Sequence, residues 1–327
     1  MNTDMAPARP SARDVGALLR HADAQARQAM TVPALVRHRL LPDAAQSLRE
    51  DDLSVAGGFV DAIAIRLADA LGAADPGALA QHALLACPPA IRLLFARTIE
   101  ARLCRQSGLI GLAMPEVPPR VEAQVGDAQD ELAEAAMALI IAQSRFISRA
   151  QGFAIDLDEL PPEVLHAVVR MAVVWLQDHD GGDPRALREA ADSLLAGFDE
   201  RRGRPHRLMR FCHLFELPRA GDDWALEENG PSLVMAMLER ASGLAGDLLF
   251  DMLRDADLAR LAVVLRACAI EPEAAARLLQ GLAVLASLRA DDLPSLAAVR
   301  AIPVEDAQRL VAGWRNLAPV QTAGSTW

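Results

Sequence analysis

The stretch LRADDL occupies residues 288–293, and two close copies precede it, LRDADL at residues 253–258 and LREDDL at residues 48–53. In each copy a Leu-Arg pair is followed by acidic residues and a final leucine. Arginine suits the negative C-terminal end of a helix, whereas aspartate at an N-terminus accepts backbone N–H bonds and opposes the positive end of the dipole. We therefore interpret the phrase as a junction where one helix ends and the next begins. No copy has the ligand spacing of a calcium-binding loop.

The sequence that follows the second and third copies indicates a repeat. The residues Leu258, Leu261 and Val264 align with Leu293, Leu296 and Val299. This spacing of about 35 residues is typical of helical-hairpin repeats. The final leucine of each phrase is thus expected to begin the apolar stripe of the next helix.

The composition favours helix over strand. Hydrophobic residues make up 52% of the chain, but aromatic residues only 4%, and tyrosine is absent. Helix starts are indicated at Asp183-Pro184, Pro161-Pro162-Glu163 and Glu271-Pro272-Glu273, where proline fits the first helical position. These signals predict an all-α protein of about fifteen helices. We expect stacked helical hairpins, in a HEAT-like or irregular α-solenoid or bundle.

A chain of 327 residues has room for two or three domains or for one extended array. Two proline- or arginine-rich stretches, residues 114–127 and 199–205, are expected to be looser joints. The predicted organisation comprises a disordered tail (1–10), an N-terminal helical region (11–113), a linker (114–127), a central helical region (128–200), a C-terminal helical-repeat region (201–317) and a second tail (318–327).

Charge and residue types exclude several chemistries. The formal net charge is −11, which disfavours nucleic-acid binding. All 33 basic residues are arginine, so a P-loop lysine and a lysine Schiff base are both impossible. The sequence also lacks a G-x-S-x-G elbow, a G-x-G-x-x-G loop and an H-E-x-x-H motif. We therefore expect no enzyme activity and no cofactor.

The cysteines and the apolar runs indicate a cytoplasmic protein. Cys87, Cys104, Cys212 and Cys268 form no C-x-x-C pair, so no zinc ribbon or redox motif is present and a reducing compartment fits. The most apolar runs, at residues 135–142 and 167–176, are too short to cross a bilayer. We expect neither a membrane nor a metal as a partner.

Several longer segments resemble a known family. They are LIIAQSRFISRAQGF (139–153), LPPEVLHAVVRMAVVWL (160–176) and LLFDMLRDADLARLAVVLRACAIEPEAAARLL (248–279), with LREDDLSVAGGFVDAIAIRL (48–67) as a weaker match. Together they resemble the DUF2336 family of bacterial proteins, over residues 45–315. The resemblance implies an all-helical, repeat-like protein, and it carries no established activity and no catalytic residues.

One basic island, RRGRPHRLMRFCHLFELPR at residues 201–219, is the main candidate site. On a helix starting at Pro205, the residues Leu208, Phe211, Cys212 and Phe215 form an apolar face, and His206, Arg210 and His213 lie opposite. The candidate partner-binding residues are Arg204, His206, Arg207, Arg210 and His213. They would contact an acidic protein surface, more strongly once the histidines are protonated. The competing interpretation is an ordinary solvated helix face.

Two weaker signals leave an alternative open. His166 and His38 are lone histidines in helical segments, and neither has the surroundings of a phosphoacceptor histidine. The loop at residues 178–183 departs from a calcium loop at its turn, where Asp183 replaces the required glycine. The sequence therefore predicts a non-enzymatic protein-interaction or regulatory module. The alternative is a signalling component that binds a small ligand or accepts a phosphoryl group, with His166 as its candidate residue.

Overall fold

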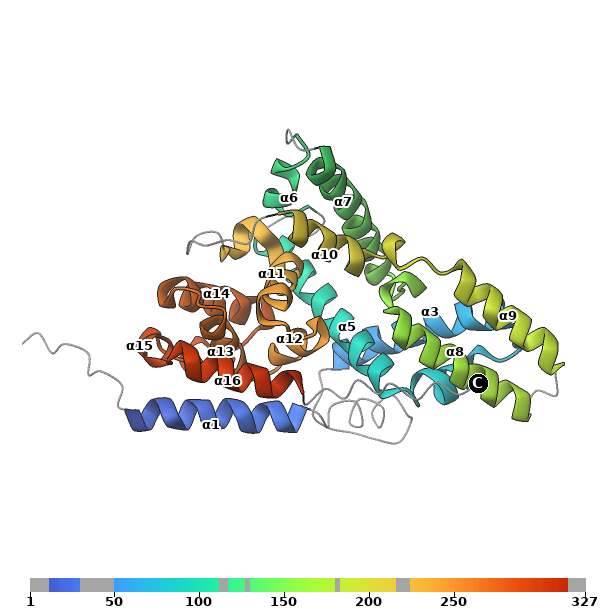
Figure 1. Ribbon diagram of the computed structural model, residues 1–327, viewed down its shortest axis with the longest axis horizontal. Coiled ribbons are helices and arrows are strands. Elements are labelled where there is room, and N and C mark those ends of the chain that lie inside the picture. Colours follow the sequence, from blue (N-terminus) through green and yellow to red (C-terminus); the bar gives the residue numbers. More distant parts are fainter. Residues whose placement is uncertain are drawn as a thin grey trace, which may run out of the picture. The chain divides into compact units, whose positions relative to one another are not determined.

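The computed structural model describes residues 12–29, 50–111, 117–126, 130–179, 183–215 and 224–316 (Figure 1). Within these ranges the fold is all-α, with fifteen α-helices and no strand, so the predicted class and helix number are confirmed. The two predicted tails, residues 1–10 and 318–327, and His38 lie outside the described residues.

The chain divides into two compact units. Unit 1 comprises Met1–Met30, Pro218–Leu226 and Met237–Trp327, and unit 2 comprises Thr31–Leu217 and Glu227–Ala236. Each unit therefore combines separate parts of the chain. The consecutive regions and linkers predicted from the sequence remain a prediction, because the two units do not locate the linkers. Within the predicted linker, a short helix forms at Pro119–Ala123.

Unit 2 carries the candidate site. Its elements are α3 (Glu50–Leu71), α4 (Pro76–Leu79), the π-helical turn η1 (Ala80–Leu84), α5 (Pro88–Leu109), α6 (Pro119–Ala123), α7 (Asp130–Gln151), the 3₁₀ turn η2 (Leu157–Glu159), α8 (Pro162–His179), α9 (Pro184–Gly197), the 3₁₀ turn η3 (Glu200–Arg202) and α10 (Arg204–Leu214). Helix α5 packs on α3 and α7, and α10 packs along α7. The core between them includes Phe59, Ile99 and Leu139, which are each at most 2% exposed.

Unit 1 is built around α13 (Ala259–Ala267). Its other elements are α1 (Ala12–Ala29), α12 (Gly246–Met252), α14 (Pro272–Ala286), the 3₁₀ turn η5 (Ala290–Asp292), α15 (Leu296–Ala301) and α16 (Val304–Arg315). Helix α13 contacts α1, α14 and α16, and its residues 259–265 are all buried. Helix α11 (Leu226–Ser242) contributes to both units, and its backbone leaves the helical conformation at Gly230, just before Pro231.

The recurring phrase lies at helix junctions. Helix α12 ends at Met252 and α13 begins at Ala259, so LRDADL connects them, and the Asp257 carboxylate accepts the Ala259 N–H at 3.1 Å. LRADDL connects α14 to α15, but there the cap is Ser295, which accepts the Ala298 N–H at 3.2 Å. The junctions are confirmed. The prediction that an acidic residue accepts a backbone N–H at the helix start is right at Asp257, which lies one residue before the N-cap Leu258. It is wrong in the third copy, because its aspartates form η5 before α15 begins.

The phrase at residues 48–53 is described only from its third residue. Glu50, Asp51 and Asp52 form the acidic first turn of α3, as predicted. The predicted helix starts at Pro162, Asp183 and Glu271 are confirmed as well. Among the described helices, no single one is long and apolar enough to cross a membrane. One pair bent by 106°, Pro76–Leu84 with Pro88–Leu109, meets the length and composition requirement jointly.

Candidate functional site

Helix α10 begins where its backbone passes very close to η2. Its N-cap residue is Gly203, and a Cβ built on Gly203 would lie 2.3 Å from the Asp158 carbonyl oxygen. A side chain at this position would therefore force the two segments apart. The glycine in the sequence RRGRP thus permits the approach that places Arg204 beside Glu159.

The side chain of Arg204 is buried between two carboxylates. Its guanidinium donates from Nε and Nη2 to Glu159, both at 2.9 Å, and from Nη1 and Nη2 to Glu100, at 2.6 and 2.9 Å. It also donates to the Gln143 side-chain oxygen at 3.2 Å and lies 3.8 Å from the ring centroid of Phe146. With 1% of the side chain exposed, Arg204 is not available on the surface for the partner contact that the sequence suggested.

A second arginine completes a neutral ion network. Arg97 lies 2.7 Å from Glu100 and 3.2 Å from Glu159, so two arginines face two carboxylates. Burial alone would raise the pKa of Glu100, but the charges of Arg204 and Arg97 outweigh it and lower the pKa to about 2. Burial also acts to lower the pKa of Arg204, and the two carboxylates overcome it and raise that pKa. Both groups are therefore held in their charged forms.

The network continues through a neutral polar cluster. The Gln143 amide donates to Ser232 at 3.3 Å and approaches the Cys104 sulfur at 3.7 Å, and Cys104 lies 3.4 Å from Ser232. Burial, together with the nearby charge of Glu100, raises the pKa of Cys104 to about 12. The thiol is therefore protonated and buried, which are not the properties of a nucleophile.

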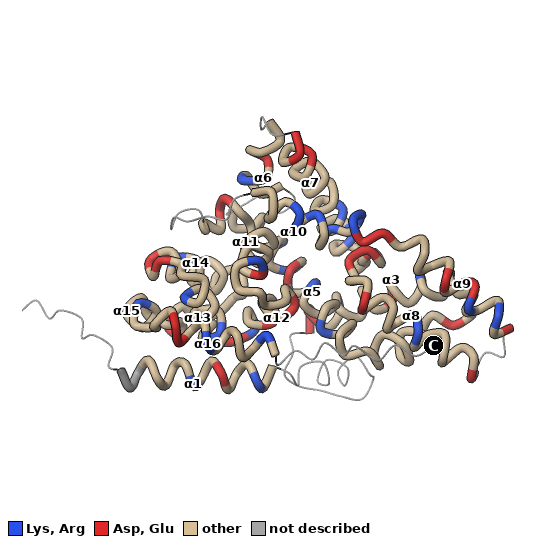
Figure 2. The backbone as a smooth tube through the Cα atoms, in the orientation of Figure 1, with Lys and Arg blue, Asp and Glu red and all other residues tan. Residues whose placement is uncertain are grey.

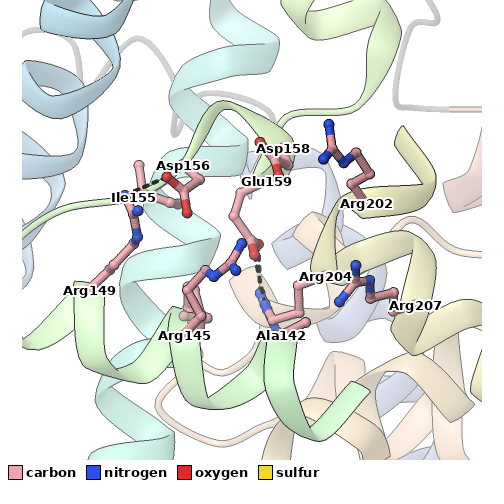
Figure 3. Close-up of a pocket in the computed structure, with 11 residues that line it drawn as sticks. Ala142, Arg145, Arg149, Ile155, Asp156, Asp158, Glu159, Arg202, Arg204 and Arg207 are labelled. Atoms are coloured by element: carbon pink, nitrogen blue, oxygen red, sulfur yellow. Dashed lines mark hydrogen bonds and ion pairs between the residues drawn. The ribbon is translucent and has the colours of Figure 1, made fainter. Parts of the chain in front are cut away.

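A shallow, solvent-open hollow lies above this network (Figure 3); its empty space of about 370 Å³ includes open solvent. Its wall is formed by α7, the segment around η2, and the start of α10. The charged side chains that line it are Arg145, Arg149, Asp156, Asp158, Glu159, Arg202, Arg204 and Arg207. Five arginines thus face three carboxylates, in a chain whose net charge is −11.

Several of these charges are already paired. Arg149 lies 2.5 Å from Asp156, and Arg204 is bound within the network. Arg207 donates to the Ala138 carbonyl oxygen at 3.1 Å. Arg145 and Arg202 form no ion pair within 4 Å with any described residue. The charge of Arg145 still acts on Asp156 and that of Arg202 on Asp199. The hollow therefore has more arginines than carboxylates, and carboxylates or phosphates are the groups such a site attracts.

The rest of the predicted site lies along α10. Leu208, Phe211 and Cys212 of the predicted apolar face are buried, and its fourth member, Phe215, is half-buried. His206 and Arg210 are half-buried and His213 is exposed. The Arg210 guanidinium is 3.6 Å from Glu131 and 3.9 Å from Glu134, both on α7, and the His213 ring is 2.7 Å from the Met209 carbonyl oxygen.

Glu100, Glu159 and Arg145 were missed by the sequence reasoning. One signal could have indicated Glu100. It occupies a stripe of α5 whose members recur at helical spacing and are all buried: Leu93, Ala96, Glu100, Leu103 and Ser107. A carboxylate in such a stripe requires a buried cation. Nothing in the local sequence identifies that cation as Arg204, which lies 104 residues away.

The alternative candidates are separate from the hollow. His166 is exposed on α8, and no hydrogen bond or ion pair joins it to a described residue. Asp183 caps α9 by accepting the Arg185 N–H at 2.9 Å, as a helix start requires. Residues 180–182 of the suspected calcium loop lie outside the described ranges. In the part of the chain that the structure covers, no three His, Cys, Asp or Glu side chains are grouped to hold a metal ion.

Comparison with known proteins identified no relative. No protein-family model matches the chain, and neither the curated proteins nor the solved structures contain a match. The all-helical character implied by the DUF2336 resemblance stands, whereas membership of that family is not shown.

Proposed function

We propose that the protein is a non-catalytic interaction or regulatory module that binds an acidic segment of a partner protein at the arginine-lined hollow. The observation that carries this proposal is the local excess of arginine at the hollow, where Arg145 and Arg202 have no ion-pair partner among the described residues. An acidic chain would otherwise repel an acidic partner, so a concentrated basic site gives the encounter its orientation.

The buried network supports the same proposal. Arg204 lies beneath the floor of the hollow, where it fixes the surrounding wall without touching a partner itself, and it is held by Glu100 and Glu159. A floor fixed in this way loses little conformational freedom when a ligand binds, which favours affinity. The half-buried His206 and Arg210 and the exposed His213 extend the basic surface along α10, and binding should strengthen when the histidines are protonated.

Three further elements of the proposal rest on sequence alone. Membership of the DUF2336 family is supported by the segments at residues 139–153, 160–176 and 248–279. A cytoplasmic location is supported by the cysteine pattern. Stacked helical repeats are supported by the alignment of the two C-terminal phrases.

The test compares two double charge reversals in the full-length chain. Arg202→Glu with Arg207→Glu changes the hollow, and Arg185→Glu with Arg188→Glu makes the same charge change on α9, where both arginines are exposed. Partners are captured from the native host, and the affinity of each purified partner is then measured. We expect at least about a tenfold loss for the hollow variant and little change for the α9 variant. Equal affinity of the two variants would overturn the proposal.

The alternative function is tested in parallel. Its only structural support is that His166 is exposed and thus accessible to a phosphodonor. Incubation with acetyl phosphate should give no acid-labile phosphate under the binding-module proposal. Acid-labile phosphate that disappears in a His166→Gln variant would instead establish a phosphoryl-accepting signalling component.

A further inference from the structure

The outward face of α7 carries a stripe of four residues that no described element covers. Met137 and Ile141 are 49% and 54% exposed, and they lie four residues apart on the same face of the helix. Glu134 precedes them by about one turn and Arg145 follows them by about one turn, and both are exposed. Figure 2 shows this change along α7, from acidic residues at its start to uncharged residues in the middle. We call these four residues the α7 stripe.

The side chains of the α7 stripe are arranged so that the stripe is complementary to a second copy of itself running in the opposite direction. It contains an acid, two aliphatic side chains and a base, at nearly even helical spacing. Turned end for end, the same stripe offers a base, two aliphatic side chains and an acid. A contact in which residue i meets residue j while j meets i is the signature of a two-fold symmetric interface.

We propose that the α7 stripe docks antiparallel against the α7 stripe of a second copy of this chain. In this arrangement Met137 of each copy packs on Ile141 of the second copy. Glu134 of each copy faces Arg145 of the second copy, so that one contact contains two ion pairs related by symmetry. Charge complementarity therefore favours a second copy of the chain over an unrelated partner.

The charged ends of the stripe are held only weakly by described residues of their own chain. Among the described residues, Glu134 forms an ion pair with Arg210 at 3.9 Å, and both side chains are substantially exposed, so that pair is weak. Arg145 has no ion pair with a described residue and leans over the hollow (Figure 3). Its long side chain can turn from the hollow to the stripe by rotation alone.

The contact is small, which limits its strength. A single pair of crossing helices buries less than the roughly 1,200 Å² at which specific interfaces begin. We therefore expect a reversible dimer with a dissociation constant on the order of micromolar to hundreds of micromolar. The wild-type chain should be monomeric when dilute and increasingly dimeric as its concentration rises.

The decisive experiment exchanges the charges of Glu134 and Arg145 by mutation. Dimerisation of each full-length variant is then measured by analytical ultracentrifugation. Glu134→Arg places arginines on both sides of each ion pair, and Arg145→Glu places glutamates there. Each single variant should dimerise at least about tenfold more weakly than the wild type. An equal mixture of the two variants should form a heterodimer, because each arginine at position 134 or 145 then meets a glutamate. The double variant Glu134→Arg/Arg145→Glu should dimerise like the wild type.

Controls separate this proposal from loss of folding and from the function proposed above. Arg188→Glu and Asp192→Arg make single charge changes on exposed positions of α9 and should leave the dimer unchanged. The variant Arg202→Glu/Arg207→Glu retains the α7 stripe and should also dimerise normally, whatever its effect on partner binding. A wild-type chain that stays monomeric at high concentration overturns the proposal, as does a mixture of the two single variants that forms no heterodimer.

Discussion

The guanidinium of Arg204 lies between two carboxylates and a phenyl ring, with nearly all of its surface withdrawn from water. A buried ion pair is not by itself evidence of high stability, because desolvation offsets much of the attraction. Removing one partner is different, because it leaves an uncompensated charge inside the protein. The consequence of replacing Arg204 is therefore predictable in sign.

We predict that Arg204→Met lowers the free energy of unfolding of unit 2 by about 3–5 kcal/mol, because Glu100 and Glu159 would then share only Arg97. Hydrogen exchange of α5 peptides at increasing urea concentrations measures this loss of unfolding free energy. Arg202→Met removes an exposed arginine two residues earlier in the chain and should change stability by less than about 0.5 kcal/mol. An equal effect of the two substitutions would contradict the account of the network.

Gly203 gives a second prediction for a single residue. A Cβ at this position would overlap the Asp158 carbonyl, so Gly203→Ala should destabilise unit 2 by about 1–3 kcal/mol. Gly197→Ala, at the end of α9, meets no atom within 4 Å and should be neutral or stabilising by up to about 1 kcal/mol. Thermal unfolding of the two variants distinguishes a steric requirement from a general preference for glycine in loops.

At the scale of helices, the copies of the recurring phrase are not equivalent. Asp257 accepts the Ala259 N–H at the start of α13, and it also accepts hydrogen bonds from His21 and Gln25 of α1, at 2.8 and 3.1 Å. Asp292, at the same place in its own phrase, is exposed and belongs to η5. An aspartate at the same position of the phrase therefore joins two helices in one copy and lies in a solvated turn in the other.

We expect Asp257→Ala to destabilise unit 1 by about 1–2 kcal/mol, through loss of the cap and of the hydrogen bonds from α1. The same substitution should also accelerate hydrogen exchange of the α1 backbone amides. Asp292→Ala should change stability by less than about 0.5 kcal/mol and leave α1 protected. Equal effects of the two substitutions would mean that the phrase acts only through local helix propensity.

At the scale of the whole molecule, Glu100 links unit 2 to pH. Its carboxylate has a pKa of about 2 in the folded chain, below its ordinary value near 4.5. A depressed pKa means that the folded state binds this proton less readily than the unfolded state does. The stability that follows is therefore fully present above the ordinary pKa and is lost as the pH falls through the folded-state pKa.

We predict that the stability difference between the wild type and Glu100→Gln shrinks by on the order of 3 kcal/mol as the pH falls from about 5 to about 2. Burial raises the pKa of Asp156 and of Asp255, but both carboxyls are present in the two chains and cancel in the comparison. Hydrogen exchange of α5 at several pH values gives this difference. A difference that stays constant with pH would show that Glu100 is not held ionised by the network.

Much of the architecture was predictable because its causes are local. Helix starts at Pro162, Asp183 and Glu271 follow from capping and from proline at the first helical position. The apolar face of α10 follows from helical spacing, and Leu208, Phe211 and Cys212 are buried as expected. Each of these inferences needs only residues within about one or two turns of one another.

The sequence by itself therefore determined the all-α class, the helix junctions and the presence of one basic segment. Only the tertiary structure decided what that segment does. It buries Arg204 against Glu159 and Glu100, which lie 45 and 104 residues away, and it leaves Arg145 and Arg202 at the rim of the hollow. The physical reason is that a charge is buried or exposed according to the groups that surround it in space, and spacing along a single helix does not specify those groups.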